Sequence, residues 1–141
     1  MPSRRRLARV VVLQTLFESQ ARSIDTDASL LTNVQELGGE AAVDVEYAQA
    51  LLAGVLRKRT SIEESITKHA PEWPLDRMDT LTRSILLLGS YELLFIEKAP
   101  PPVVMNEAIE IAKEYGPEES PKFVNGVLNA IAKGKEHSTG V

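Results

Sequence analysis

The chain lacks cysteine altogether, has only two histidines among its 141 residues, and contains no long apolar run. Without cysteine it has no disulfide framework, thiol nucleophile or cysteine-based zinc site, and its composition fits a reducing, cytoplasmic location. A membrane helix needs about 20 apolar residues, whereas the densest apolar run extends only from Ile85 to Gly89. The arginine-rich start is followed by a short apolar stretch without a small-residue cleavage site, so no secretory signal is expected.

Residues that carry catalysis are equally sparse. His69 precedes a proline turn and His137 lies in the polar C-terminal segment, so neither has a partner at metal-ligand spacing. The chain has no Gly-x-Ser-x-Gly motif and no glycine-rich phosphate loop. Glu107, Glu110 and Glu114 share one helical face, which is more typical of a solvated surface than of paired catalytic carboxylates. We therefore expect no enzymatic activity, no metal and no cofactor.

The net charge of -4 argues against a protein that coats nucleic acid indiscriminately. The distribution of charge is uneven, because the first nine residues carry four arginines and no acid, whereas residues 107–119 hold five glutamates and one lysine. A locally basic end on an acidic chain suits an anionic ligand bound at a confined site.

Apolar residues at helical spacing recur along the chain, and no segment alternates as a half-buried strand does. Start and stop residues place the expected helices at Ser3 to about Arg22, Asp27 to near Gly38-Gly39, about Asp44 to His69, about Asp79 to Ile96, Val103 to Tyr115, and Ser120-Pro121 to about Lys133. A capping-box pattern at Ser61 and Glu64 leaves open whether residues 44–69 form one helix or two. The expected fold is all-α, with about seven helices.

The proline-bounded segment from Ala70 to Pro74 is the firmest break in this helical pattern. It is expected to divide a single domain, residues 1–141, into helical subdomains at about 1–70 and about 75–135. The polar residues from about 136 to 141 are expected to be disordered.

Three features suggest binding. Arg4, Arg5, Arg6 and Arg9 oppose the helix macrodipole, yet guanidinium groups suit phosphates and bases, so they mark either an RNA contact or a solubilising terminus. Lys122-Phe123-Val124-Asn125-Gly126 puts poor helix formers into the first turns of a helix, for close helix packing or for RNA contacts, with Phe123 either stacking or in the core. Trp73-Pro74-Leu75-Asp76-Arg77, with Arg83, is either a packing anchor or a protein-binding rim.

These segments follow one another in the order of a known family, nearly end to end. They are Arg4-Arg5-Arg6-Leu7-Ala8-Arg9 with Leu13-Gln14-Thr15-Leu16-Phe17, Leu51-Leu52-Ala53-Gly54-Val55, Trp73-Pro74-Leu75-Asp76-Arg77, Ile85-Leu86, and Tyr91-Glu92-Leu93-Leu94. The most specific are Pro102-Val103-Val104-Met105-Asn106-Glu107-Ala108-Ile109-Glu110-Ile111-Ala112-Lys113 and Lys122-Phe123-Val124-Asn125-Gly126-Val127-Leu128. In these motifs the chain resembles the NusB transcription-antitermination family.

The resemblance implies two packed three-helix bundles joined by a connecting helix, and a protein that pairs with NusE, a small-subunit ribosomal protein. The pair is expected to bind single-stranded boxA RNA in nascent ribosomal RNA and to help RNA polymerase read through termination signals. Carried over by position, the RNA contacts are Arg4, Arg5, Arg6, Arg9, Lys122, Phe123 and Asn125. The expected partner contacts are Asp76, Asp79, Thr82, Arg83, Glu118 and Glu119.

Two positions depart from the family's pattern. Thr82 stands where the family often has an acid, which puts the detail of the partner contact in question. Leu87 stands where an arginine is common and is interpreted as a core residue.

The main alternative is a helical adaptor that binds proteins without touching RNA, and a homodimer is left open. If four arginines contact phosphates, the salt slope is about -2.8, which means about 50-fold weaker binding from 50 to 200 mM salt.

Overall fold

A computed structural model describes residues 2–72 and 75–139, with side chains as far as Lys135. Over these residues the chain forms helices and turns and no strand, which confirms the all-α prediction. The described part holds six α-helices and two short 3-10 turns, close to the predicted number: α1 (Arg4–Ala21), α2 (Thr26–Glu36), η1 (Gly39–Ala41), α3 (Val45–His69), η2 (Leu75–Arg77), α4 (Thr80–Phe95), α5 (Pro101–Tyr115) and α6 (Ser120–Thr139). The predicted anchor Trp73-Pro74 lies outside the described residues.

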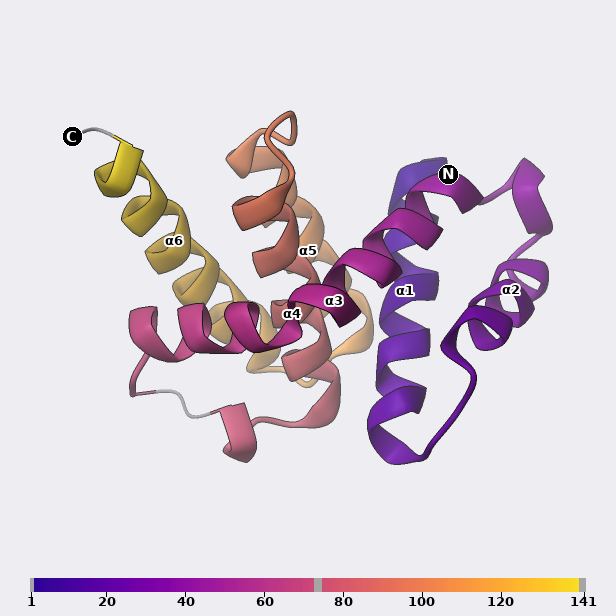
Figure 1. The fold of residues 1–141 in the computed structure, drawn as a ribbon, viewed down its shortest axis with the longest axis horizontal. Coiled ribbons are helices and arrows are strands. Elements are labelled where there is room, and N and C mark those ends of the chain that lie inside the picture. Colours follow the sequence, from indigo (N-terminus) through magenta and orange to yellow (C-terminus); the bar gives the residue numbers. More distant parts are fainter. Residues whose placement is uncertain (1, 73–74, 140–141) are drawn as a thin grey trace. The chain divides into compact units, whose positions relative to one another are not determined.

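Residues 1–57 form the first of two compact units. Here α1 packs along α2, as Figure 1 shows, and both bury an apolar face that includes Val11, Leu16 and Leu30. The Ser3 hydroxyl accepts a 3.0 Å hydrogen bond from the Arg6 N–H, so the predicted N-cap of α1 is confirmed. The predicted cap of α2 was wrong by two residues, because Asp25 rather than Asp27 accepts from the first turn.

Two adjacent glycines end α2, as the sequence predicted. Gly38 has a φ of 114° and Gly39 a φ of 71°, both in the left-handed region that side chains with a Cβ avoid. This reversal leads through η1 to Asp44, whose Oδ1 accepts from the Tyr47 N–H at 3.1 Å at the start of α3. The reversal therefore brings the beginning of α3 back to the beginning of α1, where Asp44 N–H donates to the Arg4 carbonyl at 3.1 Å.

Helix α3 runs without interruption from Val45 to His69, so the capping-box pattern at Ser61 does not start a new helix. Ile62 and Ile66 are fully buried and continue the apolar spacing of the preceding turns, which holds the helix together across this point. The boundary between the two compact units falls within this helix, between Arg57 and Lys58. The subdomain boundary expected from the sequence at Ala70 to Pro74 stays a prediction.

Residues 58–141 form the second unit, in which α4, α5 and α6 pack pairwise. Helix α4 is buried along most of its length, including Ile85, Leu86, Leu87 and Leu88, which confirms that the most apolar predicted helix is central to this unit. Leu87 has no exposed surface, so its interpretation as a core residue is confirmed. None of the described helices is both long and apolar enough to cross a membrane.

Helices α5 and α6 are longer than the sequence predicted. Helix α5 begins at Pro101 rather than Val103, because proline is well accommodated in the first turn, where its missing N–H costs nothing. Helix α6 continues to Thr139, beyond the predicted end near Lys133. Gly116 follows α5 in extended conformation, with φ -90°, so it does not make the left-handed turn expected of a glycine at this position.

The requirement for glycine at position 116 is one of space. A Cβ there would lie 2.8 Å from the Ser120 side chain and 2.9 Å from the Ala112 carbonyl oxygen. We expect Gly116→Ala to lower the free energy of unfolding by about 1–3 kcal/mol, since backbone must move to make room. Thermal unfolding followed by circular dichroism measures this, and an unchanged melting temperature would contradict it.

Candidate nucleic-acid and partner interfaces

The arginine cluster, which consists of Arg4, Arg5, Arg6 and Arg9, occupies the first turns of α1 within the first unit. Arg4 is exposed, and its Nη2 donates to the carbonyl oxygens of Glu40 at 2.8 Å and Val43 at 3.3 Å. These bonds tie the start of α1 to η1 and to the segment that follows it. Arg6 is half-buried.

Tyr47 of α3 faces two of these arginines. The guanidinium carbon of Arg5 lies 4.2 Å from the centre of the Tyr47 ring, and that of Arg9 lies 5.6 Å from it. Both distances are within the range of cation–π attraction. Arg5 also places Nε 3.9 Å from the Asp44 carboxylate, while 62% of its side chain remains exposed.

Arg9, one of the four arginines predicted to contact RNA, is almost fully buried. Only 6% of Arg9 is exposed, and its Nη2 lies 3.5 Å from the Tyr47 hydroxyl. Arg9 and Arg5 are four residues apart and share a helical face as predicted, but α3 covers the inner end of that face. With three arginines left to meet phosphates, the expected salt slope falls to about -2.1, or about 18-fold weaker binding from 50 to 200 mM salt.

A second candidate surface lies in the unit formed by residues 58–141. A cavity of about 290 Å³, which we name the α4–α6 pocket, is lined by Glu72, Arg77, Met78, Asp79, Thr82, Glu119 and Phe123. It brings together residues assigned from the sequence to the partner surface, Asp79, Thr82 and Glu119, with one assigned to RNA, Phe123. Phe123 is half-buried, so its exposure is intermediate between that of a residue that stacks on RNA and that of a core residue.

Thr82 lies on the floor of this arrangement rather than at the surface, with 1% of the residue exposed. Its hydroxyl donates to Asp79 Oδ1 at 2.7 Å and lies 2.8 Å from the Ser120 hydroxyl. Because Thr82 has one proton, which goes to the carboxylate, Ser120 must donate to Thr82. The Thr82 hydroxyl therefore joins the start of α4 to the start of α6.

The remaining predicted residues divide between exposed and internally bonded positions. Glu118 and Glu119 are exposed in the turn before α6, and Lys122 and Asn125 are exposed three residues apart on one face of that helix. Arg83 is half-buried, and its Nη2 donates to the Met78 carbonyl at 3.1 Å.

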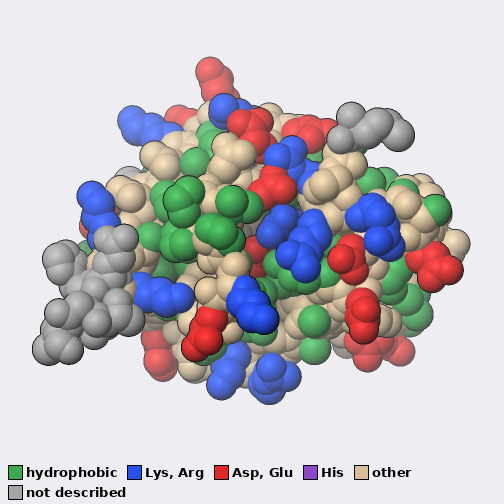
Figure 2. Space-filling view, turned by 90° about the horizontal axis from the view of Figure 1, so that it is seen from above, with side chains coloured by type: hydrophobic (Ala, Val, Ile, Leu, Met, Phe, Trp, Pro, Cys, Tyr) green, Lys and Arg blue, Asp and Glu red, His purple; other side chains and the backbone are tan. Residues whose placement is uncertain are grey.

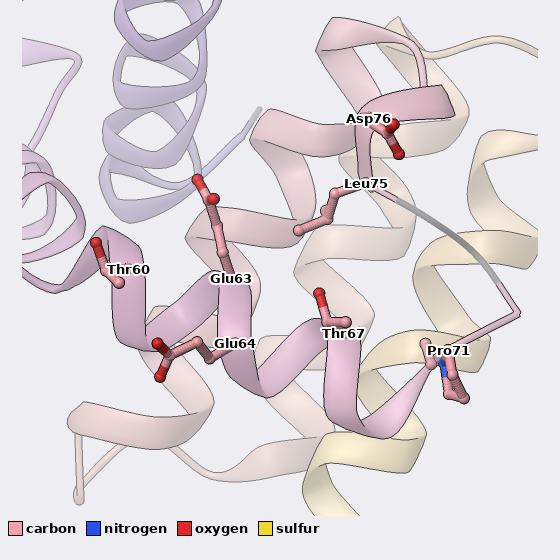
Figure 3. A pocket seen from close by; sticks show the side chains of 8 residues that line it. Thr60, Glu63, Glu64, Thr67, Pro71, Leu75 and Asp76 are labelled. Carbon is pink, nitrogen blue, oxygen red and sulfur yellow. The ribbon is translucent and has the colours of Figure 1, made fainter.

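Asp76 is exposed and belongs to a larger, open cavity of about 560 Å³. Figure 3 shows Thr60, Glu63, Glu64 and Thr67 along α3, with Leu75 and Asp76 coming from η2. Glu63 already accepts a 2.7 Å bond from Arg59 one turn earlier. No group of three or more metal-ligating side chains occurs among residues whose side chains the structure describes.

An aromatic pair that the sequence analysis did not single out lies on α4. The Tyr91 and Phe95 rings stack with centroids 5.5 Å apart, and Lys58 Nζ lies 5.5 Å from the Phe95 ring. On the face drawn in Figure 2, hydrophobic and cationic side chains likewise lie next to one another.

The sequence matches the family model described as NusB family over residues 6–133. The chain belongs to the NusB family. Among its curated relatives, Transcription antitermination protein NusB of Bacillus licheniformis is 38% identical over 128 residues, covering 91% of this chain and 95% of the relative. NusB of Bacillus subtilis is 38% identical over 139 residues, covering 96% of this chain and 99% of that protein.

Solved NusB structures share the fold. A T. maritima NusB structure superimposes with a TM-score of 0.82 at 37% identity, covering 94% of this chain and 93% of that one. A chain from a structure of the antitermination factors NusB and NusE in complex with double-stranded RNA gives a TM-score of 0.80 at 30% identity, covering 92% and 96%. The family prediction made from the ordered motifs is thereby confirmed.

Proposed function

We propose that this protein is an RNA-binding transcription antitermination factor that acts with NusE on the boxA element of nascent ribosomal RNA. Membership of the NusB family supports antitermination, and the related complex of NusB, NusE and RNA supports a shared RNA-binding surface. The main support for RNA contact in this chain is the exposed side chain of Arg5, which lies against Tyr47 at the start of α3.

The two candidate surfaces have different roles in this proposal. Arg4, Arg5 and Arg6 of the arginine cluster, together with Lys122 and Asn125, contact the RNA. Asp76, Asp79 and the acidic turn at Glu118 and Glu119 face NusE, with Thr82 shaping that surface from below. A small cationic site on a chain of net charge -4 binds RNA modestly alone, and a partner that adds contacts to the same RNA raises the affinity through effective concentration.

The test is RNA binding, with and without NusE, to a single-stranded boxA-type oligomer, a scrambled oligomer of equal length and a duplex of the same sequence. Selective binding to the single-stranded boxA oligomer, strengthened by NusE, is expected. Equal affinity for the scrambled oligomer in every mixture would overturn the RNA proposal and favour a helical adaptor that binds NusE alone.

Lys122 tests the contribution of α6. We expect Lys122→Glu to weaken boxA binding several-fold and to make the salt slope shallower by about 0.7, the value of one phosphate contact on a single strand. Lys133→Glu is the matched control, since it makes the same charge change at an exposed lysine of the same helix. Equal losses in the two variants would show that only net charge matters.

A further inference from the structure

Two residues outside the predicted site, Tyr47 and Asp44, contact the arginine cluster of the proposed RNA site. Tyr47 lies in the first turn of α3 and Asp44 immediately before it. The Tyr47 ring faces Arg5 at 4.2 Å and Arg9 at 5.6 Å, and the Asp44 carboxylate lies 3.9 Å from Arg5. Both residues belong to the first compact unit, so their contacts with the arginines arise within one packed body.

Tyr47 restricts Arg5 without covering it. A long arginine side chain loses rotamer freedom when it binds a phosphate, and contact with an aromatic ring limits that freedom beforehand. Guanidinium N–H groups that point away from the ring can still donate to an anion. The exposed fraction of the Arg5 side chain, 62%, shows that solvent and ligands still reach it.

Asp44 acts on the same guanidinium in the opposite sense. Its Oδ2 faces Arg5, while its Oδ1 accepts from the Tyr47 N–H at 3.1 Å and its carbonyl accepts from the Ala48 N–H at 3.0 Å. The bond to Oδ1 holds the carboxylate at the start of α3, beside Arg5. A phosphate oxygen that binds Arg5 therefore approaches a fixed negative charge.

We propose that Tyr47 positions Arg5 for an RNA phosphate and that Asp44 competes with this phosphate for the same guanidinium. The inference rests on the proposed RNA-binding function and makes Tyr47 and Asp44 residues that tune affinity. The pair at 3.9 Å is partly exposed, so it is weak enough to be exchanged for a phosphate yet strong enough to lower affinity. Substitutions of the two residues must then change affinity in opposite directions.

Tyr47 is tested by comparing two replacements in the full chain with the single-stranded boxA-type oligomer. Tyr47→Phe keeps the ring and should bind RNA as the unchanged protein does, because the ring rather than the hydroxyl lies against Arg5. Tyr47→Leu keeps apolar volume but removes the ring, and we expect about two- to fivefold weaker binding. Circular dichroism melts of both variants verify that the fold is retained.

Asp44 is tested with Asp44→Asn, which keeps the helix cap, since asparagine caps as well as aspartate, but removes the charge. We expect about two- to fivefold tighter RNA binding at low salt, with the gain shrinking as salt increases. Asp25→Asn is the matched control, because Asp25 caps α2 in the same unit by accepting from the Ala28 N–H. A fold defect cannot tighten binding, so this variant decides the question even if Tyr47→Leu is unstable.

The outcomes separate this inference from the function on which it rests. If Arg5→Ala leaves boxA binding unchanged, the arginine site itself is wrong. If Arg5→Ala weakens binding, while Tyr47→Leu binds normally and Asp44→Asn binds no more tightly than Asp25→Asn, the positioning inference is overturned and the RNA site stands.

Discussion

Reversing the charge of Arg5 is expected to weaken binding to the boxA-type oligomer roughly tenfold at moderate salt and to reduce the salt slope from about -2.8, the value for three arginines and Lys122, to about -2.1. The slope changes because one phosphate contact is lost, and the affinity falls further because Arg5→Glu presents a carboxylate to the RNA beside Asp44. Fluorescence anisotropy titrations at four salt concentrations give both quantities in one experiment.

Arg22→Glu is the control for Arg5→Glu, since Arg22 is an exposed arginine that follows the other end of α1. Arg22→Glu changes the net charge by the same amount as Arg5→Glu, and Arg22 lies at the opposite end of α1 from the proposed site. A loss of affinity as large in Arg22→Glu as in Arg5→Glu would mean that the RNA responds to overall charge and not to the arginine cluster.

Charge reversal at Arg9 is unsuitable as a test of RNA binding, although the sequence places Arg9 on the same helical face as Arg5. Arg9 is 94% buried against Tyr47, so a glutamate there would lose these contacts and leave a carboxylate buried away from water. A reduced affinity in Arg9→Glu would then report damage to the fold. The helical periodicity of a sequence tells which residues share a face, but not which part of that face another helix covers.

Local chemistry explains which parts of the fold were predictable. Ser3 caps α1 and Asp79 caps α4 by accepting a hydrogen bond from a residue three positions later, so these helix starts can be read from a few neighbouring residues. The two glycines after α2 adopt left-handed backbone angles, which also follow from residue type alone. The contact of Arg5 with Tyr47 joins residues 42 positions apart and depends on the reversal through Gly38. No local pattern encodes such a contact, so the sequence indicated the arginines but not the residues that hold them.

The buried bonds at the start of α4 show the same limit for the partner surface. Thr82 was assigned to the partner surface by its position in the family's pattern, where the family often has an acid. Asp79 and Glu119 line the α4–α6 pocket with it, but the Thr82 side chain is buried. Its hydroxyl connects two helix starts, which an alignment of motifs cannot reveal.

Thr82→Val is expected to lower the free energy of unfolding by about 2 kcal/mol, because it leaves the buried Ser120 hydroxyl without its acceptor. Valine has nearly the shape of threonine, so the loss reports the hydrogen bonds rather than a cavity. Asp79 keeps its 3.0 Å bond from the backbone N–H of residue 82, so the cap of α4 is weakened and not abolished. Urea unfolding followed by circular dichroism measures the change.

Ser90→Ala is the matched comparison, since Ser90 is a fully buried residue on the same helix whose hydroxyl has no hydrogen-bond partner in the described part of the chain. Removing an unsatisfied hydroxyl relieves its desolvation cost, so Ser90→Ala should be neutral or stabilising by up to about 1 kcal/mol. The additional change Ser120→Ala should recover part of the stability lost in Thr82→Val, because it removes the stranded donor. Equal losses in Thr82→Val and Ser90→Ala would show that the bond from Thr82 to Ser120 contributes nothing specific to joining α4 and α6.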